Sequence, residues 1–385
     1  MFASRTDWDQ SINAYTRVLN ELRAQDRPLS DLTISNPTEA GLVYPGEAQW
    51  KALAKPEAMN YQPQAQGLLS ARESVARYYA ERQPAAKVDP NDIFLTTSTS
   101  EAYTWLFRLL CEEGTEVLVP QPSYPLFSFL ADLCDVTLVP YPLIYDHGWQ
   151  IDLYSLEAAI TPATRAILCV HPNNPTGSCG KTEERERLNE ICNERELALI
   201  VDEVFLDYPL EAPPAESFAT NHSALTFTLS GISKVCGLPQ MKAAWIVASG
   251  PKNLREQAHS RLEVIADTYL SLSTPQQIAL PEWLNSRHPF QGSLLNRLKT
   301  NLFEADTQLN AARSIRRLHV DAGWYITVRL PALHSDEETA IHLMEEHGVI
   351  VQPGHFFEFP QDGYMVVSLM TPEEQFKEGM RKLLK

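Results

Sequence analysis

The segments RAILCVHPNNPTG (165–177) and LALIVDEVF (197–205) carry the clearest fold signal in the chain. Each begins as a nearly continuous apolar run and ends in polar residues. Such runs are typical of strands that helices cover on both faces of a sheet. Because TEERERLNEICNERE (182–196) between them has a helical pattern, the two runs predict parallel strands joined by a helix.

The same alternation extends in both directions along the chain. Helical or loop segments separate seven β-rich runs: 93–98, 116–120, 136–142, 165–172, 197–205, 224–231 and 243–249. This pattern predicts an α/β fold with a mainly parallel, seven-stranded sheet sandwiched by helices. Active sites of such sheets lie beyond the carboxyl ends of the strands.

The remainder of the chain predicts a second, smaller domain. A long polar helical region (251–315) precedes β-rich runs at 324–330, 349–353 and 364–369, with a helix near 336–347. We expect an N-terminal segment (1–45) that packs with the small domain, a large domain (46–275), and a small C-terminal α+β domain (276–385).

Composition limits the possible partners. The 385 residues are 44% apolar, and 49 acidic against 32 basic side chains give a net charge of −17. This charge repels phosphate backbones and anionic lipids, so we expect neither nucleic-acid nor membrane binding. The six cysteines form no CxxC pair, which disfavours a zinc site or a disulfide framework. The first ten residues resemble no signal peptide, and a cytoplasmic location is expected.

Residues that could take part in catalysis or ligand binding lie at the ends of three predicted strands. Lys234 lies in SGISKVCGLPQMK (230–242), just past a β-rich run, and Asn174 lies in the turn after another. Asp202 directly follows the apolar residues ALIV, so a cationic ring nitrogen would offset the cost of its burial. Taken singly, Lys234 could be a surface lysine, and Asp202 could be a helix cap or part of a core salt bridge.

Together these segments resemble the class I/II aminotransferase family, whose members are pyridoxal-phosphate enzymes of fold type I. The likeness runs from SNP near residue 35 to the C-terminus. It follows the order Tyr…Gly, Ser/Thr loop, P-x-Y, NNPTG, DE and SK. The ordered set is far more specific than NNPTG alone.

The resemblance implies pyridoxal 5′-phosphate as the cofactor and assigns roles around it. Lys234 matches the family's Schiff-base lysine, which also shuttles the α-proton. Asp202 matches the aspartate that keeps the pyridine nitrogen protonated. Asn174 would bind the 3′-oxygen of the ring, and Tyr124, in PQPSYP, matches the aromatic residue that stacks on it.

The resemblance also indicates which residues hold the phosphate. A helix N-terminus with free N–H groups suits an anion. The candidates are Ser98, Thr99 and Ser100 at such a terminus, Lys242 where the family usually has arginine, and Ser230 and Ser233 beside the lysine. Tyr61, in YQPQAQG, resembles a tyrosine that reaches the phosphate of the neighbouring subunit, which implies a homodimer with shared active sites.

Two positions depart from the family pattern. Phe205 stands where the family has a tyrosine that donates to the 3′-oxygen, so one cofactor-binding hydroxyl is missing. Val366 stands where the family has an arginine that clamps the substrate carboxylate. We expect Arg329 to replace that clamp, and Ser35 and Asn36 to match the loop that closes over the substrate.

The expected function is therefore amino-group transfer from an amino acid to a 2-oxo acid, with a slight preference for a neutral or aromatic donor. A C–S β-lyase on the same fold is the alternative. A cofactor-sensing transcriptional regulator is disfavoured, because the family-like pattern begins near residue 32 and the charge is strongly negative. A catalytically silent relative is disfavoured because both Lys234 and Asp202 are present.

Overall fold

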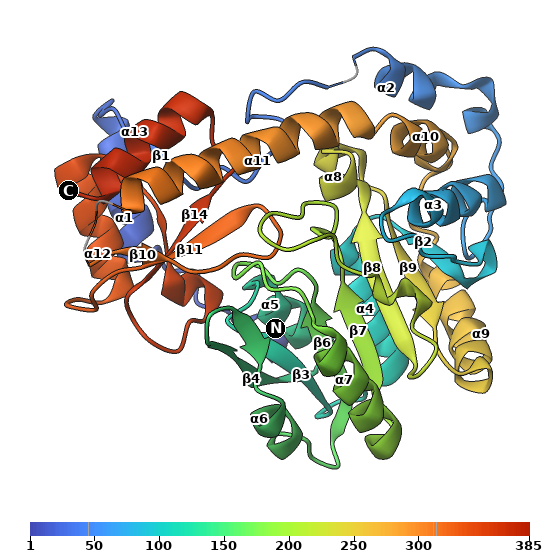
Figure 1. Cartoon of the computed structure of the whole chain (residues 1–385). Helices are drawn as coiled ribbons and strands as arrows, with labels where there is room; N and C mark the ends of the chain where they lie inside the picture. The colour runs from blue at the N-terminus through green and yellow to red at the C-terminus, as the bar shows by residue number, and fades with distance from the viewer. Residues whose placement is uncertain (45, 311, 313) are drawn as a thin grey trace.

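A computed structural model describes residues 1–44, 46–310, 312 and 314–385, and a large twisted sheet forms its centre (Figure 1). The strand order in this sheet is β2-β9-β8-β7-β6-β3-β4-β5. Its strands are β2 (Ile93–Thr96), β3 (Glu116–Gln121), β4 (Thr137–Tyr145), β5 (Trp149–Ile151), β6 (Thr164–Val170), β7 (Ala198–Asp202), β8 (Thr226–Gly231) and β9 (Ala244–Ser249).

The predicted α/β sheet is confirmed, with one addition. All seven predicted strands are present, and β5 adds a short eighth by pairing with β4 as an antiparallel hairpin. Strands β4, β3, β6, β7 and β8 run parallel to one another. Strand β9 is antiparallel to both β8 and β2, so β2, β6, β7 and β8 all place their carboxyl ends at one edge.

Helices bury both faces of this sheet, which is why its strands are apolar throughout. Alternate residues of β7 point to opposite faces. Ile200 packs in a cluster with residues of α4 (Thr99–Leu110), α5 (Leu126–Asp132) and α9 (Lys252–Tyr269). Leu199 and Val201 pack in the cluster that contains residues of α6 (Leu153–Ala158) and α7 (Thr182–Arg195). All three side chains are fully buried.

The smaller α+β domain is built on an antiparallel sheet of order β10-β11-β14-β13. Its strands are β10 (Arg316–Arg317), β11 (Tyr325–Arg329), β13 (Gln352–Pro353) and β14 (Tyr364–Ser368), and its helices are α12 (Asp336–His342) and α13 (Glu373–Leu383). The N-terminal segment lies against it: β1 (Ser30–Asp31) pairs in parallel with β12 (Val349–Ile350), and α1 (Ala14–Ala24) packs on α12.

One long helix, α11 (His288–Leu309), connects the domains. It runs from the side of the large domain to the small one (Figure 1). By contrast, α10 (Thr274–Asn285) packs on α3 (Leu69–Glu81), near α2 (Ala48–Lys51), and Trp283 of α10 is fully buried there. Sequence analysis assigns residues from 276 onward to the small domain, and we propose instead that the boundary follows α10. Within the described residues, no helix is both long and apolar enough to cross a membrane.

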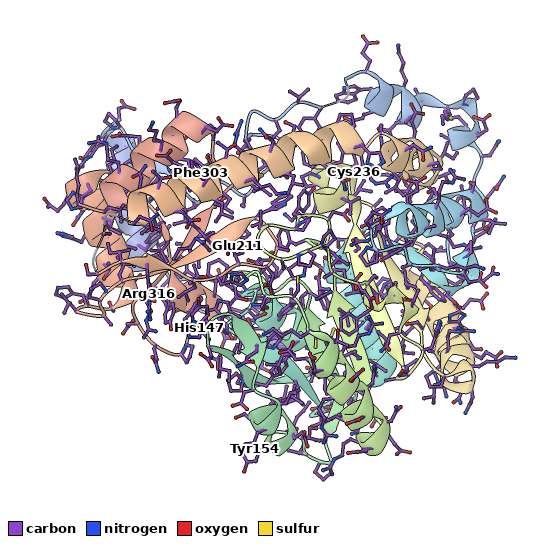
Figure 2. The ribbon with its side chains drawn as sticks, in the orientation of Figure 1. His147, Tyr154, Glu211, Cys236, Phe303 and Arg316 are labelled. Carbon is purple, nitrogen blue, oxygen red and sulfur yellow. The ribbon has the colours of Figure 1, made fainter. Side chains whose placement is uncertain are left out.

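The loop after β7 ties the large domain to the small one. Glu211, labelled in Figure 2, accepts hydrogen bonds from the Arg317 guanidinium at 2.7 and 2.9 Å and from the backbone N–H of Val320 at 2.8 Å. The backbone N–H of Ala322 donates to the carbonyl of Gly177 at 3.0 Å. The NNPTG turn is therefore held directly by the segment that leads into β11.

Gly177→Ala tests how closely this turn is packed. Gly177 has φ +70°, and an added Cβ would lie 2.3 Å from Val320 Cγ2 and 2.5 Å from the Ala322 carbonyl oxygen. A left-handed alanine costs roughly 1–2 kcal/mol, and the forced movement adds roughly 1–3 kcal/mol. Denaturant unfolding should show both losses. Gly114→Ala is the matched control, since Gly114 has φ +78° and nothing within 4 Å of an added Cβ. Equal losses in the two variants would contradict the tight packing.

Candidate active site

A cavity of about 310 Å³ lies at the carboxyl edge of β6, β7 and β8, beside the N-terminus of α4. It brings together eleven of the residues singled out in the sequence: Ser35, Ser98, Thr99, Ser100, Tyr124, Asn174, Asp202, Phe205, Ser233, Lys234 and Lys242. These residues come from positions as far apart as 35 and 242, so only the fold makes them neighbours.

Lys234 reaches this cavity from α8 (Ile232–Val235), the single helical turn that follows β8. Burial lowers the pKa of its amine from 10.5 to about 8, although the charge of Asp202 opposes this shift. The Nζ atom lies 4.8 Å from the ring centre of Trp324 and 5.6 Å from that of Phe205. At pH 7 about a tenth of an amine with this pKa is neutral, far more than of an ordinary lysine, and the neutral amine is the form that attacks a carbonyl carbon.

Asp202 ends β7, and both of its carboxylate oxygens accept a hydrogen bond. Oδ1 accepts from the backbone N–H of Val204 at 3.0 Å, and Oδ2 accepts from the Tyr103 hydroxyl at 2.8 Å. Burial raises the pKa of Asp202, while these two donors and Lys234 lower it. Sequence analysis missed Tyr103, because in SEAYTWLFRLL it looks like one more apolar residue of an amphipathic helix.

Asn174 is oriented by the turn in which it lies. The Asn173 side-chain amide donates to the Pro122 carbonyl at 3.2 Å and to Thr176 Oγ1 at 2.9 Å, and the Gly177 backbone N–H donates to the Asn173 carbonyl at 2.7 Å. Asn174 itself is buried, and its Oδ1 atom has no hydrogen-bond partner among the described residues. This oxygen is therefore an acceptor that a water or a ligand in the cavity can satisfy.

The lining residues at the N-terminus of α4 are suited to binding an anion. Ser98 is the N-cap of the twelve-residue helix α4, and its hydroxyl accepts from the backbone N–H of Glu101 at 3.1 Å. Thr99 and Ser100 form the first turn, where backbone N–H groups are free and the helix dipole is positive. Lys242 also lines the cavity and adds a cationic side chain.

Aromatic rings also line the cavity. Tyr124 is 42% exposed and stands edge-on to Phe127, with ring centres 5.9 Å apart. Phe205 is edge-on to Trp324 at 5.2 Å, and Tyr325 of β11 also lines the cavity. Sequence analysis did not single out Phe127 as a site residue, because its aromatic character does not distinguish it from the core.

Four predicted residues do not line this cavity: Ser230, Asn36, Tyr61 and Arg329. Ser230 lies within β8, fully buried, and its hydroxyl has no partner among the described residues. The Asn36 side chain instead accepts from the backbone N–H and hydroxyl of Thr38, at 3.1 and 2.8 Å. Tyr61 is 71% exposed and lines a different pocket.

The structure does not support Arg329 as the replacement clamp. Arg329 ends β11, four residues beyond Tyr325, and lines a separate pocket with Arg316 and Asp362. Its guanidinium lies 5.4 Å from the ring centre of Tyr364. Arg329 lies on the same face of β11 as Tyr325, because the two residues are an even number of positions apart. It is nevertheless too far along the strand to line the cavity. Among the described lining residues, the cations are Lys234 and Lys242.

Comparisons with known proteins identify the family of this chain. The family model for aminotransferase class I and II matches residues 30–383. The chain is 27% identical to an alanine aminotransferase of Mycobacterium tuberculosis, with 89% of this chain and 82% of the relative covered. It is 25% identical to the glutamate-pyruvate aminotransferase AlaA of Haemophilus influenzae, with 94% and 91% covered.

Among solved structures, alanine aminotransferase from Pyrococcus furiosus superposes with a TM-score of 0.89 at 23% identity, covering 99% of this chain and 98% of that one. An aminotransferase from Escherichia coli has a TM-score of 0.86 at 23% identity, covering 99% and 96%. At these identities the superpositions establish the fold, and the family-model match establishes the kinship. The chain belongs to the aminotransferase class I and II family, whose members depend on pyridoxal phosphate, and it is a transaminase.

Proposed function

We propose that this transaminase moves an amino group between a small neutral amino acid and a 2-oxo acid, with pyridoxal 5′-phosphate held by Lys234. One observation carries the proposal: a lysine whose amine has a pKa of about 8 lines the same cavity as the buried carboxylate of Asp202. Burying both ionisable groups costs free energy unless they interact favourably with a ligand or with each other.

The residues present fit this cofactor. The unpartnered Oδ1 of Asn174 shows that the cavity lining has an unused polar atom, and the Asn174 side chain would contact the 3′-oxygen. Ser98, Thr99, Ser100, Ser233 and Lys242 would hold the phosphate, and Tyr124 would cover one face of the ring. Asp202 would face the ring nitrogen.

When bound, the cofactor supplies an electron sink for charge that develops at the substrate Cα. The chain's own residues supply the rest. Lys234 would hold the cofactor covalently until the substrate amine displaces it, and as a free amine it would then move the proton from Cα to the carbon of the former cofactor aldehyde. Asp202, as an anion, keeps the ring nitrogen protonated. Tyr124 and Phe205 exclude water from the reacting atoms.

Uncharged hydrogen-bond donors would bind the carboxylate of the substrate. Because the described cationic lining residues are both assigned to the cofactor, Asn174 and Ser35 are the proposed contacts for the substrate carboxylate. The names of the relatives, alanine aminotransferase and glutamate-pyruvate aminotransferase, support alanine and pyruvate as one amino acid and 2-oxo acid pair of the reaction. Nothing in these names favours the C–S β-lyase alternative.

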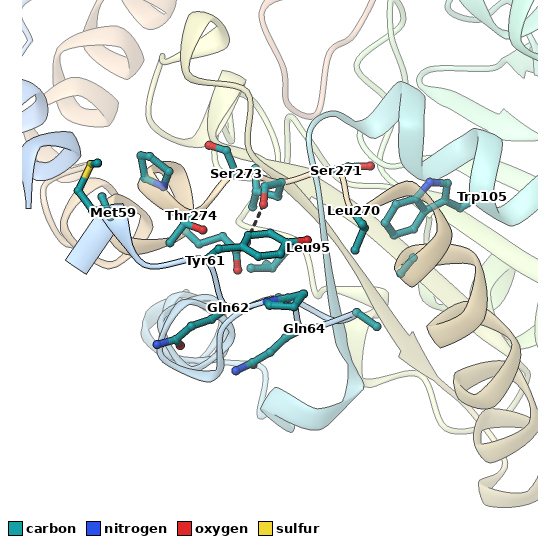
Figure 3. Close-up of a pocket in the computed structure, with 18 residues that line it drawn as sticks. Met59, Tyr61, Gln62, Gln64, Leu95, Trp105, Leu270, Ser271, Ser273 and Thr274 are labelled. Atoms are coloured by element: carbon teal, nitrogen blue, oxygen red, sulfur yellow. Dashed lines mark hydrogen bonds between the residues drawn. The ribbon is translucent and has the colours of Figure 1, made fainter. Parts of the chain in front are cut away.

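We also propose a homodimer in which Tyr61 completes the site of the neighbouring subunit. Large apolar side chains are exposed along the surrounding segment: Val43, Trp50 and Met59 are 69%, 70% and 87% exposed. Exposed apolar surface of this extent is typical of an interface. Met59 and Tyr61 line a pocket of about 400 Å³ beside Ser273 and Thr274 (Figure 3).

A cytoplasmic location is part of the same proposal. All six cysteines are free thiols, which is consistent with a reducing compartment.

Lys234→Ala tests the central assignment. Only a lysine amine can attach the cofactor through a bond that borohydride reduces, so the variant should lose the reducible adduct seen by mass spectrometry in the wild type. Lys242→Ala is the control: it should keep the adduct and bind the cofactor more weakly, because it loses a phosphate contact. An adduct that persists in Lys234→Ala would remove this lysine from its role.

The pH dependence of cofactor capture follows from the pKa of Lys234. The neutral amine is the attacking form, so capture by the cofactor-free protein should accelerate about tenfold per pH unit below pH 8 and level off above it. Stopped-flow absorbance measures this rate. A profile that still rises toward pH 10 would show that the amine keeps its ordinary pKa of 10.5.

Subunit mixing tests the shared site. Tyr61→Ala and Lys234→Ala each impair both sites of their own homodimer. In a heterodimer of the two variants, one site combines an intact Lys234 with an intact Tyr61, so activity should return to about half that of a wild-type dimer. If Tyr61 acts within its own subunit, mixing restores nothing.

A further inference from the structure

Tyr103 lies behind the cavity and contacts its carboxylate directly. It belongs to α4, it is 2% exposed, and its hydroxyl donates to Asp202 Oδ2 at 2.8 Å. The other carboxylate oxygen accepts from the backbone N–H of Val204 at 3.0 Å. One donor on each oxygen restricts rotation of the carboxylate and leaves the remaining lone pairs for a ligand in the cavity.

Packing holds the Tyr103 ring in place. Its centre lies 5.1 Å from that of Phe127, edge-on, and 6.2 Å from that of Phe107, at a tilt. Phe127 itself lines the cavity. The hydroxyl therefore has a fixed direction, and no side-chain reorganisation accompanies its hydrogen bond.

The titratable groups around Asp202 come from several elements. Lys234 and Tyr124 face it from the cavity, and Cys169 of β6 lies near Tyr103. Burial and the charge of Asp202 raise the pKa of Tyr103 well above 10, so the phenol stays a donor. Burial raises the pKa of Asp202, and the Tyr103 hydroxyl counteracts that rise. Without this donor, more of the carboxyl would be protonated at a given pH.

The hydroxyl of Tyr103 matters more because Phe205 has no hydroxyl of its own. The Phe205 ring, which stands edge-on to Trp324, offers the cavity no donor. The hydroxyl of Tyr103 reaches the site from behind the carboxylate instead.

We propose that Tyr103 is a positioning residue that keeps Asp202 both oriented and negatively charged toward the cofactor ring. This inference rests on the proposed function, because it gives Tyr103 a role only if Asp202 serves the cofactor. Tyr103 never touches the substrate, and it acts through the carboxylate.

Tyr103→Phe is the direct test, because it removes one oxygen and keeps the ring packing. A charge-assisted hydrogen bond corresponds to a fall in kcat of about 10- to 100-fold, and KM for the amino donor should stay within about twofold. The acid limb of the kcat profile should move to higher pH, because a carboxylate with a higher pKa becomes protonated earlier as the pH falls. An unchanged kcat and an unshifted limb would overturn the proposal.

The cofactor-free protein provides a second readout. In protein with ¹³C-labelled aspartate carboxyls, the Asp202 resonance is the one missing from Asp202→Asn. Its titration should move to higher pH in Tyr103→Phe, and a midpoint identical to that of the wild type would contradict the proposal. Tyr141→Phe is the matched control, since the buried Tyr141 hydroxyl donates to the Leu168 carbonyl at 2.9 Å. It should leave the titration and kcat unchanged.

A double-mutant cycle separates this inference from the proposed function. In an Asp202→Asn background, adding Tyr103→Phe should change kcat less than about twofold, because the charge that it supports is already gone. Multiplicative losses would refute coupling through the carboxylate. If the wild type and Tyr103→Phe both fail to form a reducible adduct, the proposed function itself fails; an adduct in both confines any negative result to Tyr103.

Discussion

Mutual electrostatic support between Lys234 and Asp202 is the constraint around which the cavity is organised. Burial lowers the pKa of Lys234 and raises the pKa of Asp202, so it favours the neutral form of both groups. Their opposite charges, with two hydrogen bonds on the carboxylate, limit that loss of charge. The result is an amine with a pKa near 8 beside an acid that has donors on both oxygens.

The sheet supplies the rigidity that this arrangement needs. Asp202 lies at the end of β7, and Lys234 follows the end of β8; these strands are parallel neighbours, so both residues lie on one edge of the sheet. The Asn174 turn follows β6 on the other side of β7. Because apolar residues on both faces of β7 are fully buried, a displacement of the carboxylate would disturb two layers of core packing.

The substrate side differs in chemistry from the cofactor side. Val366 is buried in β14, paired with Thr327 and Gln352, and Arg329 faces another pocket. Recognition through neutral groups gives less binding energy than a bidentate guanidinium clamp. In the proposed site, such recognition would also select less strongly for a carboxylate.

Sequence alone was sufficient for the α/β class, the seven main strands, and the positions of Lys234, Asp202 and Asn174. These features are local: apolar runs mark buried strands, and polar residues mark their ends. Tertiary structure decided what depends on distance and direction. Tyr103 resembles any apolar residue of its helix until the fold places its hydroxyl on Asp202. Arg329 has the right parity but lies too far along its strand, and Asn36 satisfies its own turn. A one-dimensional pattern records which face a side chain occupies, whereas its reach and its partners are set by how the strands and helices pack.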